Sequence, residues 1–151
     1  MNSQQTGKVR LVGINHVALE VGDIEEALAF YARFFDFSLR GRSDRMAFID
    51  MGDQFLALSA VEQLSTDRHR HFGLVVDNRD RLRETLQEQR IELVPGKGLN
   101  FRDPWGNLIQ VVDYRDIQFS KTDAVLRGMG LDLDKSPEAL TQLRDKGLLE
   151  S

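Results

Sequence analysis

Two short stretches of the chain share one alternation of hydrophobic and polar positions. The first is INHVALEV, residues 14–21, and the second is HRHFGLVV, residues 69–76. Successive side chains of a strand point to opposite faces, so His16 and His71 each lie opposite a continuous apolar face. The pattern therefore predicts two strands that each bury one face against a helix and present a histidine on the other.

Each of these strands is followed by a pattern typical of a helix. Asp23 and Asn78 are good N-cap residues, and apolar side chains recur after them at helical spacing. The turn-forming segments 51–53 and 103–107 then separate further alternating runs. We expect helices after Asp23 and over 79–90, a loop at 41–44, and further strands at 37–40, 45–50, 54–61, 92–94, 99–102 and 108–114.

The two halves keep a nearly constant register. His71 follows His16 by 55 residues (71 minus 16), and Ile109 follows Leu56 by 53 residues (109 minus 56). So small a drift across several elements indicates a duplicated βαβββ unit, and each unit forms only about half of a core, so the two must pack together. The predicted fold class is α+β, with one domain over residues 1–116 built from modules at about 11–61 and 69–115.

The remaining residues, 117–151, belong to neither copy. The run from Asp123 to Met129 is compatible with a short helix. Ser136-Pro137-Glu138 has the features of a helix start, with an N-cap serine and a proline at the first helical position. We expect a helical C-terminal extension that docks on the body of the protein or on a second subunit.

Composition narrows the class of partner. Of the 151 residues, 41% are hydrophobic and 29% charged, the formal net charge is -4, and cysteine is absent. No basic stripe indicates nucleic acid, and no apolar run reaches the roughly 20 residues that a membrane-spanning helix needs. The start of the chain lacks the apolar core of a secretory signal. We expect a cytoplasmic protein whose partner is a small molecule rather than nucleic acid or a membrane.

Three segments together resemble the vicinal-oxygen-chelate superfamily, which includes glyoxalase I, extradiol dioxygenases, and fosfomycin- and bleomycin-resistance proteins. They are INHVALEVGDIEEALAFYARFF, HFGLVVDN and FRDPWGNLIQVVD, within residues 12–115. The resemblance implies glyoxalase-like modules whose mixed sheets curl around a cavity, and association as a homodimer. It also implies that the first and last strand of each module supply the ligands of a divalent metal (Fe, Mn, Ni, Co or Zn). Those positions here are His16, Ala57, His71 and Gln110.

These ligand positions differ from those of the metal enzymes that the chain resembles. Those enzymes usually have glutamate where Gln110 stands, and many have a fourth ligand at the position of Ala57. Histidines and a carboxamide are acceptable donors for a divalent metal, but they form a neutral set. His69 has the same strand parity as His71 and would lie on the same face, about 6.6–6.8 Å away. Alternatively, His69 is a solvated residue at the end of a linker.

Other residues could complete a site. Glu20 shares the strand face of His16 and is either a catalytic acid or base or a solvated carboxylate at the rim. The Arg102 guanidinium can bind a carboxylate or phosphate group, and its alternative is a solvated surface position. The remaining candidates either line a substrate pocket or fill the core; they are Phe48, Ala57, Phe101 and Trp105.

Three functions fit this pattern. The first is a glyoxalase-like metalloprotein that chelates a small substrate through vicinal oxygens and carries out lyase, isomerase or dioxygenase-type chemistry. The second is a metal-free protein that binds or sequesters a small molecule, as bleomycin-resistance proteins do. The third is a pseudoenzyme that serves as an interaction module. The histidines favour the first function, whereas Ala57 and Gln110 favour the second.

Overall fold

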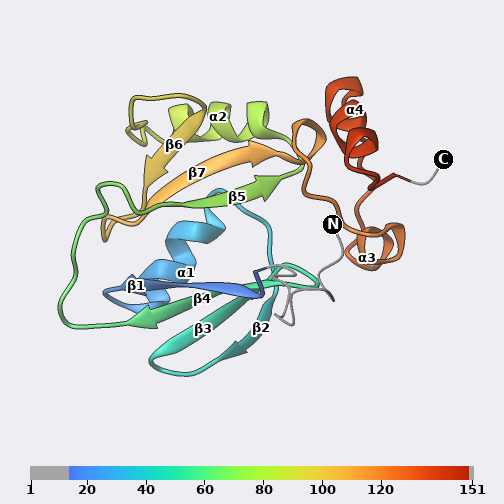
Figure 1. Ribbon diagram of the computed structural model, residues 1–151. Helices are drawn as coiled ribbons and strands as arrows, with labels where there is room; N and C mark the ends of the chain where they lie inside the picture. Colours follow the sequence, from blue (N-terminus) through green and yellow to red (C-terminus); the bar gives the residue numbers. More distant parts are fainter. Residues whose placement is uncertain (1–13, 150–151) are drawn as a thin grey trace, which may run out of the picture.

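The alternating runs of the sequence form the strands of two sheets in a computed structural model that describes residues 14–149 (Figure 1). The predicted start of the first module, at about residue 11, lies outside the described residues. The first module consists of β1 (His16–Val21), α1 (Ile24–Ala32), β2 (Leu39–Arg42), β3 (Met46–Asp50) and β4 (Phe55–Ala60). The second consists of β5 (Phe72–Val76), α2 (Arg79–Glu88), β6 (Leu99–Arg102) and β7 (Leu108–Asp113). The tail contains η2 (Tyr114–Asp116), α3 (Asp123–Gly128) and α4 (Pro137–Asp145).

Strand register confirms the duplication. The first sheet has the order β1-β4-β3-β2, and β1 runs parallel to β4 with Val17 beside Leu56. The second sheet has the order β5-β7-β6, and β5 runs parallel to β7 with Phe72 beside Ile109. Phe72 follows Val17 by 55 residues and Ile109 follows Leu56 by 53, which are the two predicted offsets. Equivalent residues therefore pair in both modules, and the α+β fold is confirmed.

The strand predicted at 92–94 is wrong. Leu93 makes only an isolated bridge to Phe101, so the second sheet has three strands and the first has four. Gly96 follows with a positive φ of 143°, a conformation that turns the chain out of an extended path. The segment after α2 therefore turns away before it can form a continuous ladder of hydrogen bonds with β6.

The second strand of the first module is also displaced from its predicted position. It begins at Leu39 and continues through Gly41 and Arg42, which we expected in a loop. The pairing with β3 shifts register between Leu39 and Gly41, and such a bulge lets a strand continue past a local irregularity. An alternating pattern of hydrophobic and polar residues assumes a regular strand, so it could not predict this shift in register.

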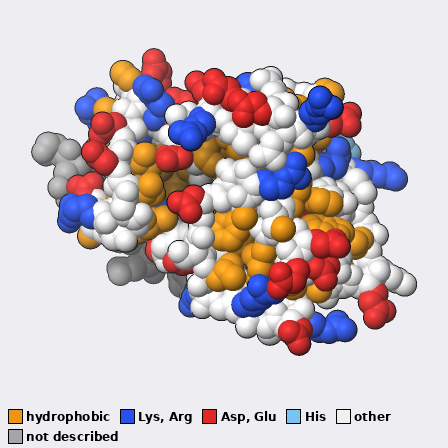
Figure 2. All heavy atoms as spheres, turned by 180° about the vertical axis from the view of Figure 1, so that it is seen from behind, with side chains coloured by type: hydrophobic (Ala, Val, Ile, Leu, Met, Phe, Trp, Pro, Cys, Tyr) orange, Lys and Arg blue, Asp and Glu red, His pale blue; other side chains and the backbone are white. Residues whose placement is uncertain are grey.

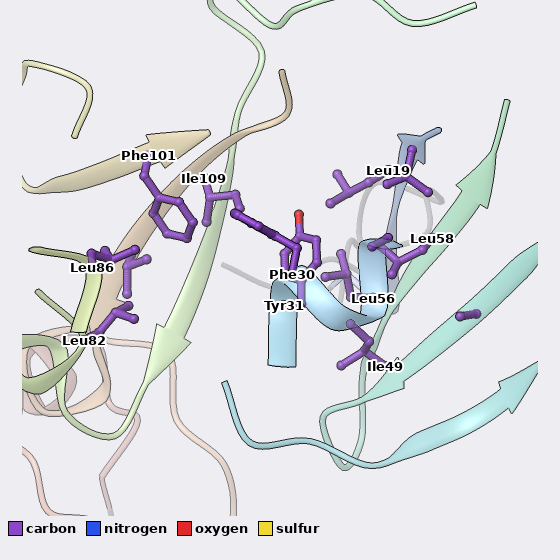
Figure 3. Packing of buried hydrophobic residues seen from close by; sticks show 14 of the residues in the cluster. Leu19, Phe30, Tyr31, Ile49, Leu56, Leu58, Leu82, Leu86, Phe101 and Ile109 are labelled. Carbon is purple, nitrogen blue, oxygen red and sulfur yellow. The ribbon is translucent and has the colours of Figure 1, made fainter. Parts of the chain in front are cut away.

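Helix α1 lies between the two sheets and packs against both (Figure 1). Figure 3 shows Phe30 and Tyr31 of this helix pointing toward the second sheet, while Leu56 and Leu58 of the first sheet lie on the other side. The Phe30 ring centroid is 6.5 Å from that of Phe101. The buried side chains of both modules therefore form one hydrophobic core.

The predicted helix starts are confirmed by their caps. Asp23 accepts a hydrogen bond from the backbone N–H of Glu26, Asn78 from that of Arg81, and Ser136 from that of Ala139. Each cap satisfies a backbone donor that the first helical turn leaves free. No helix among residues 14–149 is long and apolar enough to cross a membrane.

Two lysines hold the tail in place, one against the first module and one within the tail itself. Lys121 donates to the carbonyl of Met51 at 2.8 Å and also binds Asp53, both in the β3–β4 turn. Lys135 donates to three backbone carbonyls that follow β7, those of Tyr114, Ile117 and Phe119. Burial lowers the pKa of Lys135 from its usual value, although the charge of Asp113 opposes that shift. The tail thus spans one end of the molecule.

Charged side chains of both signs are interspersed over the face seen from behind (Figure 2). Apolar patches lie between them, and the visible face has no extended stripe of one charge. This distribution agrees with the small net charge of -4 and gives no electrostatic footprint for nucleic acid on that face.

Candidate functional site

His16 begins β1 and is held by two neighbours on the exposed face of the first sheet. Its ring stacks on Phe55, with 4.7 Å between centroids and 7° between planes. Its Nδ1 lies 2.9 Å from Oδ1 of Asn15. A carboxamide oxygen accepts and does not donate, so this contact suits the tautomer in which Nδ1 carries the proton and Nε2 keeps its lone pair. Phe55 also lies 4.7 Å from the guanidinium carbon of Arg40.

His71 immediately precedes β5 and has the same proton arrangement. Its Nδ1 lies 2.9 Å from the backbone carbonyl oxygen of His69, which again can only accept. Nε2 of the neutral His71 ring therefore keeps its lone pair as well. Both rings are exposed, and the ring of His69 is exposed too. His69 therefore contacts the His71 ring through its backbone carbonyl.

A fixed Nδ1–H and a free Nε2 form the arrangement that metal-binding histidines usually have. A carbonyl or carboxylate that accepts from one ring nitrogen holds the tautomer and the orientation of the other. The same arrangement also suits a general base, because the free nitrogen can accept a proton. The sequence did not predict the contact with Asn15, which directly precedes His16, or the stacking on Phe55, which lies beside His16 in the ladder.

His16 and His71 lie at opposite ends of the chain's fold. His16 pairs with Phe55, next to the β3–β4 turn on which the tail docks through Lys121. His71 lies at the start of β5, and the tail begins beyond the opposite end of that sheet, where Val76 pairs with Asp113. Figure 1 shows β1 and β5 pointing in opposite directions. One chain therefore does not bring the two rings together.

Within residues 14–149 of a single chain, no cluster of potential metal ligands of the expected kind forms. Among residues 14–149, no three side chains of His, Cys, Asp or Glu are grouped so that they could hold a metal ion. Gln110 is half-buried between Gly73 and Asn100 on the second sheet, two residues along the ladder from the position of His71. A Cβ added to Gly98 would lie 3.7 Å from Nε2 of Gln110, so the carboxamide extends toward the loop before β6.

Ala57 and Phe48 share one row of the first sheet. Ala57 is 2% exposed, pairs with both Ala18 and Phe48, and offers no donor to a metal. The half-buried Phe48 ring meets Phe55 edge-on at 5.6 Å. The exposed face of the first sheet therefore presents aromatic rings and the imidazole of His16.

Glu20 is exposed and lies at the other end of β1 from His16. The two residues are four apart on one strand, which corresponds to about 13 Å. The backbone carbonyl of Glu20 accepts a hydrogen bond of 2.8 Å from Nδ2 of Asn107. Glu20 therefore lies beside the 103–107 turn, at the end of the molecule where β5 begins.

That turn carries a buried polar network. The Asp103 carboxylate accepts from Tyr31 Oη at 2.9 Å, from the backbone N–H groups of Trp105 and Asn107, and from Nδ2 of Asn107 at 2.7 Å. Burial, and then the charge of Asp103 and its hydrogen bond, raise the pKa of Tyr31 well above its usual value. The turn-forming role expected of Asp103 and Asn107 is confirmed. The contact with Tyr31 was missed, although a buried tyrosine hydroxyl requires a partner.

A shallow depression of about 390 Å³ lies beside the same turn. It is lined by Leu64, Thr66, Arg102, Asp103, Pro104, Trp105 and Gly106. Two of the expected pocket residues, Arg102 and Trp105, thus meet here. Trp105 packs on Gly22 so closely that a Cβ there would lie 2.4 Å from the indole Nε1. Phe101, in contrast, is fully buried and belongs to the core.

Comparison with known proteins agrees with this architecture. The family model described as the glyoxalase/bleomycin resistance protein/dioxygenase superfamily matches residues 13–111. The metallothiol transferase FosB of Lysinibacillus sphaericus (strain C3-41) is 25% identical over 96 residues, which cover 60% of this chain and 68% of that protein.

Solved structures share the fold at low identity. A lactoylglutathione lyase from Agrobacterium tumefaciens has a TM-score of 0.59 and 19% identity, covering 70% of this chain and 96% of its own. A mutant of the fosfomycin resistance protein FosX from Listeria monocytogenes, complexed with Mn(II) and 1S,2S-dihydroxypropylphosphonic acid, has a TM-score of 0.58 and 17% identity. That match covers 68% of this chain and 92% of its own.

Proposed function

Because the chain belongs to the glyoxalase/bleomycin resistance protein/dioxygenase superfamily, we propose that it is a metal-dependent enzyme acting on a small oxygenated molecule. The observation that carries this proposal is the shared state of His16 and His71. Each has Nδ1 occupied by an oxygen acceptor, and each offers Nε2 on an exposed surface at the equivalent place of its module. Paired ligands of this type suit a divalent metal such as Fe, Mn, Co, Ni or Zn.

The proposed site forms between two copies of the chain. Within one chain the two histidines lie at opposite ends, so neither can complete the site of the other. A two-fold axis can bring the start of β1 of one copy to the start of β5 of the second, and it does so twice. Partly exposed apolar side chains support burial of these surfaces, including Val75 at 36% and Leu39 at 40%. A homodimer is therefore the proposed active form.

The residues present define distinct roles at such a site. His16 and His71 would hold the metal, and Gln110 would add a neutral oxygen. A bound divalent metal would polarise two adjacent substrate oxygens and stabilise developing negative charge. Asn15 and the carbonyl of His69 keep the rings oriented. Glu20 is the proposed proton acceptor, because it is an exposed carboxylate at the end of the molecule where His71 lies.

The decisive experiment measures metal uptake by protein purified without a metal-affinity tag. We expect one Mn²⁺ or Co²⁺ per chain for the wild type, loss of binding in His16→Ala and in His71→Ala, and retention in the matched control His69→Ala. Less than a tenth of an equivalent of metal on titration of the wild type would exclude the metal enzyme.

Mixing the two inactive variants tests whether the site is shared. When His16→Ala and His71→Ala subunits exchange freely, about half of the dimers are mixed, and each mixed dimer has one intact site. We expect recovery of about a quarter of the wild-type metal content. No recovery, with subunit exchange verified by mass spectrometry, would show that each site is contained within one chain.

A substitution at Gln110 sharpens the ligand assignment. Gln110→Glu restores an anionic oxygen, and we expect metal affinity to rise because divalent metals bind carboxylates more strongly than carboxamides. Gln118→Glu, which adds the same charge in the tail, is the control. Equal affinity of Gln110→Glu and wild type would place Gln110 outside the ligand set.

The second candidate is a metal-free protein that binds or sequesters a small molecule. It is favoured by the absence of a donor at the buried Ala57 and by the neutral side chain of Gln110. Such a protein would bind its ligand equally well in EDTA and with added metal. The metal titration therefore distinguishes the two candidates.

A further inference from the structure

Arg102 carries a positive charge that the surrounding protein leaves largely uncompensated. It is half-buried on β6, and Nη2 donates to the backbone carbonyl of Asp67 at 3.2 Å. Its Nε is buried and has no hydrogen-bond partner among residues 14–149. Within the described part of the chain, no ion pair involves Arg102. Since a guanidinium has five N–H donors and a buried charge is costly when unpaired, this group is suited to an anion.

The nearest acidic residues are engaged elsewhere. Asp103 also lines the depression, but its carboxylate accepts hydrogen bonds from Tyr31, Trp105 and Asn107. Asp67 accepts from the backbone N–H of Leu108 at 3.2 Å and lies 3.5 Å from Arg70. Neither carboxylate is therefore the missing counter-ion.

The depression that Arg102 lines has one polar and one apolar side. Leu64, Pro104 and Trp105 supply the apolar surface, and Thr66 supplies a hydroxyl. The acidic residue of the lining, Asp103, is 4% exposed. Its volume of about 390 Å³ falls in the range of small-molecule sites. A ligand that matches this lining has an anionic group for Arg102 and a compact apolar part.

Strand register places Arg102 in the same row of the second sheet as His71. Arg102 pairs with Leu108, and the pairing of Phe72 with Ile109 sets His71 beside Leu108. Two strand spacings separate Arg102 from His71, which is about 10 Å between their backbones. A small molecule can span that distance.

We propose that this depression binds the anionic end of the substrate, and that the substrate is a small organic carboxylate, phosphate or phosphonate with an apolar flank. This inference rests on the proposed function, because it takes the ligand of the depression to be the substrate of the metal site that includes His71. The bound anion pairs with the Arg102 guanidinium, and its apolar part packs on the indole of Trp105.

Trp105 provides a direct readout because it is the only tryptophan of the chain. The experiment titrates the full-length protein in EDTA with phenylacetate, with its neutral analogue 2-phenylethanol, and with inorganic phosphate. Calorimetry gives the dissociation constants, and Trp105 fluorescence locates the binding. We expect phenylacetate to bind at least tenfold more tightly than 2-phenylethanol and inorganic phosphate, with a change in Trp105 emission.

Two variants at Arg102 and one control test the assignment. Arg102→Gln should weaken phenylacetate binding at least tenfold, and Arg102→Lys should lie between it and the wild type, because the charge remains without the planar fork. Arg79→Gln is the matched control, since Arg79 is also half-buried with an unpaired Nε but does not line the depression. Its affinity for phenylacetate should stay within twofold of the wild type.

The inference is overturned by equal binding to Arg102→Gln and wild type, by equal binding of 2-phenylethanol and phenylacetate, or by calorimetric binding without a change in Trp105 emission. If Arg102→Gln does not fold, the comparison of Arg102→Lys with the control decides. Failure here is distinct from failure of the metal proposal, because these titrations are done in EDTA and Arg102→Lys should leave Mn²⁺ uptake unchanged.

Discussion

Asp50 and Asp103 occupy equivalent places in the two modules, 53 residues apart, and their surroundings differ sharply. Asp50 is exposed and accepts one bond of 3.3 Å from the backbone N–H of Gly52. Asp103 is 4% exposed and accepts four hydrogen bonds, including one from Tyr31 in the other module. The duplication preserved strand register, while one copy of this carboxylate became a buried polar link between the modules.

The helices differ in the same way. Leu86 follows Tyr31 by 55 residues, and both side chains are fully buried. Only Tyr31 carries a hydroxyl to the partner module, and only α1 lies between the two sheets. The first module therefore contributes more to the shared core, and the two copies should respond unequally to equivalent substitutions.

The largest expected effect breaks the link at Asp103. Asp103→Ala removes a buried acceptor of four hydrogen bonds and leaves their donors without a partner. We therefore expect a loss of about 3–5 kcal/mol in the free energy of unfolding. Asp50→Ala, the equivalent substitution, should cost less than about 0.5 kcal/mol because its carboxylate is solvated. Urea denaturation measures both. Losses within about 1 kcal/mol of each other would refute the asymmetry between the two carboxylates.

A smaller effect compares the two first strands. Leu19 is 6% exposed, whereas its equivalent, Leu74, is only half-buried. We expect Leu19→Ala to cost about 3 kcal/mol and Leu74→Ala about half of that, because the loss grows with the apolar surface and cavity involved. Parallel denaturation curves at equal protein concentration give the difference. A larger loss for Leu74→Ala would reverse our ranking of the modules.

The smallest effect is a pH dependence at Tyr31. Its pKa is raised in the folded protein, first by burial and then by Asp103, so the folded state keeps a proton that the unfolded state releases above pH of about 10. The stabilising contribution of Tyr31 is fully present below that pH and is lost as pH rises further. Tyr31→Phe should cost about 1 kcal/mol at pH 7 and show less loss of stability at alkaline pH than the wild type.

Denaturation curves at pH 7 and at pH values above about 10 test this sign, with Tyr114→Phe as the control. Tyr114 is the other tyrosine of the chain and is also buried, at 6% exposure. An alkaline loss in Tyr31→Phe as steep as in the wild type would assign that loss to other groups.

Local patterns in the sequence predicted much of this fold. The offsets of 55 and 53 residues predicted the strand register, and strand parity predicted that His16 and His71 face away from the core. The cap residues Asp23 and Asn78 fixed the helix starts. Each of these features depends on neighbours within a few positions, or on an internal repeat that is visible in the chain itself.

The remaining features depend on how the two modules are placed in space. The contact between Tyr31 and Asp103 joins residues 72 apart, and no periodicity indicates it. The separation of His16 from His71 follows from the opposite directions of β1 and β5 (Figure 1). The failed strand at 92–94 depends on Gly96, whose positive φ removes the chain from the sheet.

The stacking of His16 on Phe55 has a spectroscopic consequence. Protons held above the face of a benzene ring experience its ring current and are shifted upfield in NMR spectra. The parallel rings, 4.7 Å apart, place the imidazole protons of His16 in that shielding region, whereas no aromatic stacking involves His69 or His71 within residues 14–149. With three histidines in the chain, the His16 resonances should stand apart from the other two, so ligand binding at each imidazole can be followed separately in one solution.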